Sequence, residues 1–235
     1  MAIQRDFYLR QLIDRQWNGQ VKIITGIRRC GKSFLLNVLF RDYLVKNGTP
    51  ENCILSIELD QLKNLRYRNP LELAAYARGW AEANPEARHF LFVDEIQLSE
   101  RVPNPALPSG APITFYDALN DLRSLPNLDV YVTGSNSKLL SNDIATEFRG
   151  RGDPIRLHPL SFAEYYAAIG GGDKQVALHD YLTYGGMPKR LEFKDDEERV
   201  AYLSNLITEI YLRDIVERNR LAHPELLERI LHLLC

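Results

Sequence analysis

Cysteine is scarce in this chain of 235 residues, with only Cys30, Cys53 and Cys235. They are far apart, odd in number and never in CxxC spacing, so neither a disulfide framework nor a zinc site is indicated. A surplus of charge is also lacking, because 29 basic residues stand against 31 acidic ones and the formal net charge is -2. No whole-molecule field would therefore attract nucleic acid or an anionic membrane.

Long apolar runs are missing as well. The sequence has no stretch of about 18 apolar residues, and its N-terminus, MAIQRDFYLRQL, mixes charged and apolar residues. These patterns predict neither a membrane span nor a signal peptide, and with so few cysteines they favour a cytoplasmic protein. A hydrophobic fraction of 45% and a charged fraction of 26% are typical of a soluble globular protein.

Short apolar runs alternate with helical patterns up to Leu160. Five runs are typical of strands, at residues 21–25, 53–59, 89–95, 130–135 and 154–160. Helical patterns such as 33–47 and 70–84 separate them, which predicts an α/β fold whose parallel sheet carries helices on both faces. After Leu160 the patterns are helical, with a glycine break at 170–172 and another at YGGMP. We therefore expect a core over residues 1–165, followed over 166–235 by a helical lid and the start of a further region.

GIRRCGKS, residues 26–33, lies between a predicted strand and a predicted helix. GxxxxGK[ST] in this context is the phosphate-binding loop, or Walker A motif, whose backbone N–H groups surround nucleotide phosphates at a helix N-terminus. Gly26 and Gly31 would permit the turn, Lys32 would reach the β and γ phosphates, and the Ser33 hydroxyl would ligate Mg²⁺. The residues assigned to nucleotide binding are Gly26, Arg29, Cys30, Gly31, Lys32, Ser33 and Phe34.

Parts of this loop have a second interpretation. Arg28 and Arg29 would face the nucleotide or a partner, or they would simply be solvated at the loop tip. Cys30 is most simply a small packing residue, because nothing around it marks a reactive thiol. The motif by itself does not separate ATP from GTP, nor an ATPase from a kinase.

A pair of acids in HFLFVDEIQ favours an ATPase. Asp94 is placed at the carboxyl end of a buried strand, where its carboxylate would meet the Mg²⁺ held by Ser33. Glu95 would point to the other side of the strand and deprotonate a water for attack on the γ-phosphate. A nucleotide kinase would exclude water from this position. The alternative is a solvated strand end with no role in chemistry.

VYVTGSNSKLLS supplies a further polar strand end. Thr133, Ser135 and Asn136 would lie at the same sheet edge as Lys32 and Asp94. Asn136 is the preferred sensor of the γ-phosphate or of the attacking water, ahead of Ser135. Helix capping is the other interpretation, because Ser137 precedes an apolar helical pattern.

Together these motifs resemble a known group, the AAA+ ATPases. The matching stretches are IITGIRRCGKS, LFVDEIQ, VYVTGSNSKLLS, FRGRGDPIRLHPLSFAEYY and YLTYGGMPKR, which span residues 21–190. Within that group the sequence is similar to a prokaryotic family of predicted ATPases with a poorly characterised C-terminal domain, related to STAND and archaeal ATPases. The resemblance implies ATP with Mg²⁺, the sheet order of other AAA+ cores and a helical lid.

The same resemblance implies that the chain is the ATPase portion of a longer protein. Members of the family usually continue into a domain that resembles restriction endonuclease folds. The final stretch LLERILHLLC is strongly apolar and has no helix stop signal, which agrees with this expectation.

YGGMP resembles the GxP element of STAND signalling ATPases, in which the proline packs near the adenine. Pro188 would take that role, and Lys189 and Arg190 would reach the phosphates from the lid. The alternative is a plain helix-breaking turn. In PLSFAEYY, residues Phe162, Tyr165 and Tyr166 have the spacing of a helical core and are expected to join the domains rather than to stack on bases.

FRGRG, residues 148–152, resembles the place where AAA+ proteins carry an arginine that enters a neighbouring subunit's active site. Arg151 is the first choice for this arginine and Arg149 the second. Such a role implies a homo-oligomer. The alternative is an ion pair with Asp153 or Glu147 inside the same chain.

The sequence as a whole predicts Mg-dependent ATP binding and hydrolysis that drive a conformational change. A nucleotide-gated switch with slow turnover would use the same motifs. A nucleic-acid-dependent ATPase is suggested by KNLRYRN, where Lys63, Arg66 and Arg68 flank Tyr67. Nucleic acid and protein therefore both stay open as partners, and a membrane is not expected.

Overall fold

The computed structural model describes residues 3–107, 110–134, 148 and 150–207. The chain divides into two compact units, one comprising Ala2–His158 and one that begins at Pro159. The division of roles between residues 1–165 and 166–235 stays a prediction.

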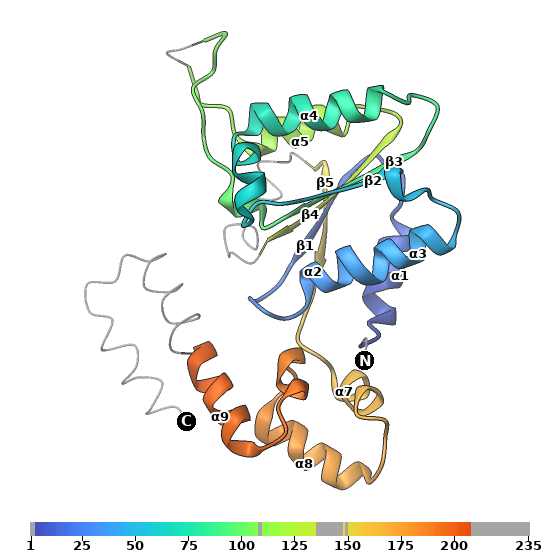
Figure 1. Ribbon diagram of the computed structural model, residues 1–235, viewed down its shortest axis with the longest axis vertical. Helices are drawn as coiled ribbons and strands as arrows, with labels where there is room; N and C mark the ends of the chain where they lie inside the picture. The colour runs from blue at the N-terminus through green and yellow to red at the C-terminus, as the bar shows by residue number, and fades with distance from the viewer. Residues whose placement is uncertain (1–2, 108–109, 135–147, 149, 208–235) are drawn as a thin grey trace, which may run out of the picture. The chain divides into compact units, whose positions relative to one another are not determined.

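A five-stranded parallel sheet forms the centre of the first unit (Figure 1). Its strands are β1 Val21–Thr25, β2 Ile54–Glu58, β3 His89–Asp94, β4 Leu128–Gly134 and β5 Gly152–Arg156. They lie side by side in the order β2-β3-β4-β1-β5, and each pair is parallel. All five predicted strands are present, and the predicted α/β P-loop fold class is confirmed. The strand bounds differ from the expected ones by a few residues, most clearly in β5.

Burial distinguishes the central strands from the edges of the sheet. Every residue of β1, β3 and β4 is buried, whereas the edge strands β2 and β5 are partly exposed. Near-continuous apolar runs such as HFLFVD are what a parallel sheet needs when helices cover both of its faces.

Helices cover the two faces of the sheet in separate layers (Figure 1). Helices α4 Pro70–Glu82 and α5 Phe115–Leu122 lie on one face. On the other face lie α1 Asp6–Asp14 and a continuous helical segment made of α2 Lys32–Phe34, η1 Leu35–Phe40 and α3 Arg41–Lys46. Short 3-10 helices complete the unit: η2 Glu51–Cys53, η3 Leu62–Arg68 and η4 Ile96–Leu98.

The helical segment after the 26–33 loop is present as predicted, but it is not α-helical throughout. Its middle part, η1, is a π-helix. π-Helices are rare in proteins, and those that occur are frequently found at functional sites. Asn37 in this segment accepts a hydrogen bond of 2.7 Å from the Ser56 hydroxyl of β2. The π-helical turn therefore ties the helix to an edge strand of the sheet.

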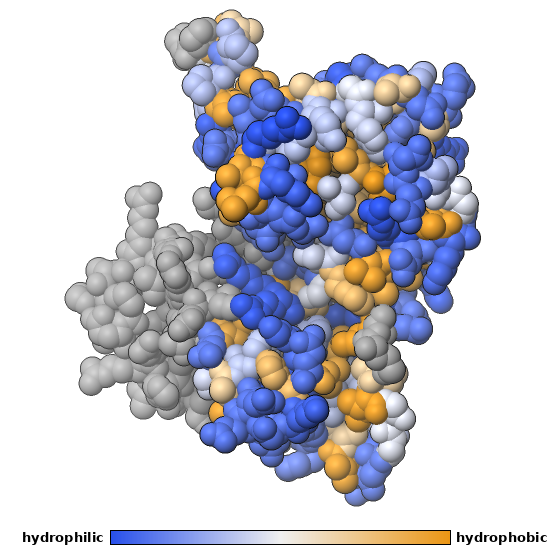
Figure 2. Space-filling view, viewed as in Figure 1, coloured by the Kyte–Doolittle hydropathy of each residue, from blue (hydrophilic) through white to orange (hydrophobic). Residues whose placement is uncertain are grey.

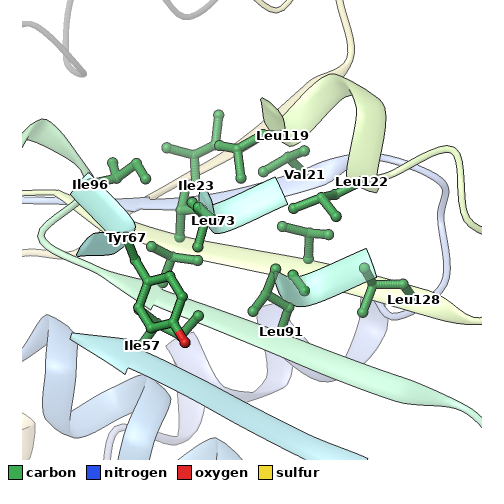
Figure 3. Packing of buried hydrophobic residues seen from close by; sticks show 14 of the residues in the cluster. Val21, Ile23, Ile57, Tyr67, Leu73, Leu91, Ile96, Leu119, Leu122 and Leu128 are labelled. Carbon is green, nitrogen blue, oxygen red and sulfur yellow. The ribbon is translucent and has the colours of Figure 1, made fainter. Parts of the chain in front are cut away.

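Each face of the sheet has its own hydrophobic core. Figure 3 shows the first, in which Leu73 of α4 and Leu119 and Leu122 of α5 pack over Val21 and Ile23. The second core places Leu12, Leu35 and Phe40 against Ile24, Phe92 and Tyr131. Adjacent strand residues such as Ile23 and Ile24 thus serve opposite cores, as strand geometry requires. On the molecular face seen in Figure 2, hydrophobic side chains form several separate groups among hydrophilic ones.

One buried ion pair interrupts the second core. Lys22 of β1 donates a hydrogen bond to Asp129 of β4, and both residues are almost fully buried. Asp129 also accepts hydrogen bonds from the Trp17 backbone (3.0 Å) and the Tyr131 hydroxyl (2.8 Å). Burial lowers the pKa of Lys22, while the charge and hydrogen bond of Asp129 act in the opposite direction.

The described part of the second unit is helical. It contains α7 Phe162–Ala168, α8 Lys174–Tyr184, the 3-10 helix η6 Pro188–Glu192 and α9 Asp196–Asn205. Helix α7 begins with a capping box, in which the Ser161 and Glu164 side chains satisfy each other's backbone N–H groups. Within the part of the chain that the structure describes, no helix has both the length and the apolar character needed to cross a membrane.

We expect Asp129→Ala to lower the free energy of unfolding by about 3–5 kcal/mol, because Lys22 would remain buried without its charge partner. Urea unfolding followed by circular dichroism would measure this. Asp121→Ala is the matched control, because Asp121 pairs with Arg78 at the surface and its side chain is 52% exposed. That exposed pair should contribute under about 1 kcal/mol. Equal losses in the two variants would contradict a structural role for the buried pair.

Candidate functional site

Polar groups from three neighbouring strands meet at the carboxyl edge of the sheet, which is the edge where the parallel strands end. Thr25, the last residue of β1, is paired with Gly134 of β4, and the 26–33 loop follows it directly. In the β3–β4 pair Val93 lies opposite Val132, so the next residues, Asp94 and Thr133, are also neighbours. The carboxyl ends of parallel strands share an edge, and this is where ligands bind in open α/β sheets.

The loop fits closely against the chain that follows β5. A Cβ atom at Gly26 would lie 2.3 Å from the Leu157 carbonyl oxygen and 2.9 Å from the Cys30 sulfur, so a side chain cannot be accommodated. Gly31 caps α2 with a φ of 100°, in the region that favours glycine. The two motif glycines therefore meet separate requirements, close packing at Gly26 and a left-handed turn at Gly31.

Lys32 lies inside the loop rather than in solvent. Its ammonium group donates hydrogen bonds to the carbonyl oxygens of Gly26 (3.2 Å) and Ile27 (3.0 Å), and the residue is 4% exposed. Ser33 and Phe34 are partly buried in the same first helical turn. A buried cation at the start of a helix makes this a site of positive potential, suited to anions.

Arg29 and Cys30 face different surroundings. Arg28 and Arg29 are exposed, and Arg29 has a φ of 63°, which is uncommon outside glycine. Cys30 is fully buried, and its sulfur lies 3.8 Å from the Leu157 carbonyl oxygen. Burial raises the pKa of the Cys30 thiol, which agrees with the packing interpretation rather than with a reactive thiolate.

The Thr133 hydroxyl joins the two acidic residues. It donates a hydrogen bond to the Asp94 carboxylate and accepts one of 3.2 Å from the Glu95 backbone N–H. Asp94 and Thr133 are both buried. A hydroxyl can donate once and accept as well, so one side chain fixes both positions. This bridging role was not predicted from the sequence, although the adjacent ends of β3 and β4 could have indicated it.

Glu95 is oriented by a turn and not by strand alternation. Strand β3 ends at Asp94, and Glu95 has left-handed backbone angles (φ 55°, ψ 47°) at the start of η4. Its carboxylate accepts a hydrogen bond from the Gln97 side-chain amide. Strand alternation was expected to set the direction of the Glu95 side chain, and this explanation is wrong because Glu95 lies beyond the end of β3. The contact with Gln97 was not predicted from the sequence.

The residues present suit a hard divalent cation. Asp94 and Ser33 offer a carboxylate and a hydroxyl oxygen, and Mg²⁺ prefers oxygen ligands from one or two carboxylates together with water and phosphate. The buried Lys32 ammonium at the start of the helix offers a positive charge suited to an anionic group such as phosphate. This donor set fits Mg²⁺ bound together with a nucleotide.

Arg151 lies at the amino edge of the sheet, where the parallel strands begin, and thus opposite to the carboxyl edge. Its carbonyl oxygen accepts a hydrogen bond of 3.0 Å from Val21, the first residue of β1, and its side chain is exposed. Asp153 pairs with Arg15 at 3.1 Å, so this acid already has a cation from another segment. Asn136, Ser135, Glu147 and Arg149 lie outside the described residues.

The YGGMP turn lies in the second unit, and the local backbone accounts for both of its glycines. Gly185 ends α8 with a φ of 71°, and a Cβ at Gly186 would lie 2.2 Å from the Leu160 carbonyl oxygen. Pro188 is the first residue of η6, and its contact with adenine stays a prediction. Both glycines are thus required by the local backbone.

The expectation that Arg190 reaches the phosphates is wrong. Arg190 is 1% exposed and donates hydrogen bonds to the Gly185 carbonyl (2.7 Å) and the Asp180 carboxylate (2.8 Å). Its guanidinium lies over the Tyr165 ring, 4.6 Å from the ring centre. Arg190 therefore stabilises the helical unit from inside.

The KNLRYRN stretch is also engaged within the chain. Tyr67 is buried, Arg66 stacks on its ring at 4.5 Å, and Arg68 donates a hydrogen bond of 2.9 Å to the Leu59 carbonyl. A buried tyrosine is not available to stack on bases. That the ATPase depends on nucleic acid stays a prediction, and the KNLRYRN stretch no longer supports it.

Comparison with known proteins adds two family matches. A family model described as an AAA domain matches residues 18–166, and one described as a domain of unknown function matches residues 175–235. An uncharacterized protein of Haemophilus influenzae is 31% identical over 234 residues, which cover 97% of this chain and 54% of the relative. An uncharacterized protein of Methanocaldococcus jannaschii is 27% identical over 237 residues, covering 94% and 46%. The chain thus spans about half the length of these relatives.

Similar solved structures share little sequence with the chain. The Walker-type ATPase of Pyrococcus abyssi has a TM-score of 0.49 at 15% identity, covering 98% of this chain and 75% of its own. The Aeropyrum pernix ORC2 protein has a TM-score of 0.46 at 14% identity, covering 70% and 49%.

We expect Thr133→Val to lower the free energy of unfolding by about 1–3 kcal/mol, because the buried Asp94 carboxylate would lose a donor and the Glu95 N–H an acceptor. Thr133→Ser keeps the hydroxyl and should cost about 1 kcal/mol through its lost methyl group. Urea unfolding of both variants provides the measurement. If valine is tolerated as well as serine, the hydroxyl does not hold the two acids.

Proposed function

The chain belongs to the AAA domain family, and we propose that it binds ATP with Mg²⁺ and hydrolyses it to drive a conformational change. The observation that carries the proposal is the meeting of the phosphate loop, Asp94 and Thr133 at one sheet edge. An anion site next to a buried carboxylate is what a metal-bound triphosphate requires.

Phosphate binding is assigned to the loop and to Lys32. The backbone N–H groups at the start of α2 supply hydrogen bonds and a positive helix end. Lys32 now donates to two carbonyl oxygens of its own loop. Phosphate oxygens are stronger acceptors for an ammonium group than neutral carbonyls, so Lys32 would exchange these partners for the β and γ phosphates.

Metal binding and water activation are assigned to neighbouring residues. Ser33 and Asp94 would hold Mg²⁺, which when bound neutralises charge on the β and γ phosphates. Glu95 would accept a proton from the attacking water. Gln97 orients the Glu95 carboxylate, and Thr133 fixes its backbone. These contacts hold Glu95 beside Asp94 in a fixed orientation, as a positioned base requires.

Arg151 is assigned to the site of another subunit. It precedes β5 at the amino edge of the sheet, whereas the phosphate loop leaves the carboxyl edge. The five residues of β1 separate these edges by roughly 16 Å. An arginine at that distance does not reach its own site, but its exposed side chain is free to enter a neighbour's.

We expect Glu95→Gln to bind Mg-ATP with wild-type affinity and to lower the hydrolysis rate by at least about 100-fold, because the amide cannot accept the water's proton. Isothermal titration and a phosphate-release assay provide the two readouts. Lys32→Ala is the binding-deficient control and should lose at least about tenfold in affinity. Single-turnover hydrolysis compared with steady-state release separates an active ATPase from a slow nucleotide-gated switch. Wild-type turnover in Glu95→Gln would place the base elsewhere.

We expect Arg151→Ala to bind ATP normally and to hydrolyse it roughly 10³- to 10⁵-fold more slowly, the range attributed to an arginine supplied in trans. Mixing Arg151→Ala with Glu95→Gln should restore part of the activity, because mixed assemblies contain shared sites with both groups intact. Arg101→Ala, at another exposed position, is the control. Unchanged turnover in Arg151→Ala, or no recovery on mixing, would leave Arg151 without this role.

A further inference from the structure

A buried arginine from the N-terminal segment lies against the phosphate loop. Arg5 is 3% exposed and caps helix α1, with its carbonyl oxygen accepting hydrogen bonds from Tyr8 (3.0 Å) and Leu9 (2.9 Å). Burying a guanidinium is costly unless its N–H groups find acceptors. The identity of those acceptors therefore indicates what the arginine does.

The Arg5 guanidinium joins two segments that are distant in sequence. Its Nη1 atom donates to the Cys30 carbonyl oxygen of the phosphate loop (3.3 Å), and its Nη2 atom donates to the His158 carbonyl oxygen (2.7 Å). The group also lies over the Tyr8 ring, 4.8 Å from its centre. The Tyr8 hydroxyl in turn accepts a hydrogen bond of 3.3 Å from the His158 N–H. Both polar groups of the His158 backbone are thus held by the N-terminal segment.

The contact with Cys30 fixes more than one atom. A peptide unit is planar and trans, so the Cys30 carbonyl and the Gly31 N–H point in opposite directions from the same plane. A donor that holds the carbonyl also sets the direction of that N–H. Gly31 is the last residue before Lys32, and its N–H belongs to the backbone groups assigned above to the phosphates.

We propose that Arg5 is a positioning residue of the nucleotide site, which orients the Cys30–Gly31 peptide for phosphate and holds His158 to the same guanidinium. The inference rests on the proposed function, since it names a further determinant of ATP affinity. His158 is the last residue of the first unit, and Pro159 begins the second. Nucleotide bound at the loop therefore restrains the point at which the chain leaves the ATPase unit.

Geometry explains why arginine is needed here. A guanidinium presents several N–H donors in a rigid planar fork and can serve two carbonyl oxygens at once. Lysine would keep the charge but would offer one flexible ammonium, which is less suited to holding two segments at fixed separation. Arg5→Lys should therefore be an intermediate variant rather than a neutral one.

The test compares Mg-ATP affinity in Arg5→Ala, Arg5→Lys and the control Arg10→Ala, whose exposed side chain lies on the same helix. Titrations are run at a temperature where circular dichroism shows each variant folded. We expect the dissociation constant to rise about 10- to 100-fold in Arg5→Ala, less in Arg5→Lys and not at all in Arg10→Ala. Amide hydrogen exchange should show ATP protecting residues 157–158 in the wild type but not in Arg5→Ala.

Affinity and exchange separate this role from simple stabilisation, which would lower the melting temperature alone. Wild-type ATP affinity in a folded Arg5→Ala would overturn the inference while leaving the proposed function intact. Absence of ATP binding by the wild-type protein would overturn both. If Arg5→Ala does not fold, Arg5→Lys decides, and wild-type affinity together with wild-type protection of residues 157–158 in that variant would overturn the inference.

Discussion

Parallel pairing of β3, β4 and β1 is the constraint on which the site depends. It brings Thr25, Asp94 and Thr133 to one edge of the sheet, although they are far apart in the chain. Shifting one strand by a single residue would turn its side chains to the other face and separate the Thr133 hydroxyl from Asp94. The two hydrophobic cores, which use alternate residues of the same strands, oppose such a shift.

Backbone strain is concentrated at this edge. Among the described residues, Trp17, Arg29 and Glu95 are the non-glycine residues with positive φ, and the last two belong to the candidate site. Such conformations cost on the order of 1–3 kcal/mol each and persist where the surroundings determine them. For Glu95 the surroundings include Thr133 and Gln97. The same contacts that hold the strained turn therefore also keep its carboxylate in place.

Local signals in the sequence are sufficient for the strands and for the strand–loop–helix arrangement around residues 26–33, because GIRRCGKS and its flanking apolar and helical patterns are contiguous. Contacts between distant segments were not predictable in this way. Lys22 and Asp129 are 107 residues apart, and Arg5 and His158 are 153 apart. The assignment of Arg190 to the phosphates failed for a related reason, since sequence pattern does not tell a buried arginine from an exposed one.

The position of Arg151 also restricts the symmetry of any assembly that uses it. A subunit that offers its Arg151 edge to a neighbour's phosphate-loop edge contributes a different surface from the one it receives on. Where these two surfaces lie on opposite sides of the subunit the interface is heterologous, whereas a twofold dimer needs both of them within one self-complementary patch. In the heterologous arrangement the subunits follow one another head to tail, and the rotation between them decides whether they close into a ring or continue as a filament.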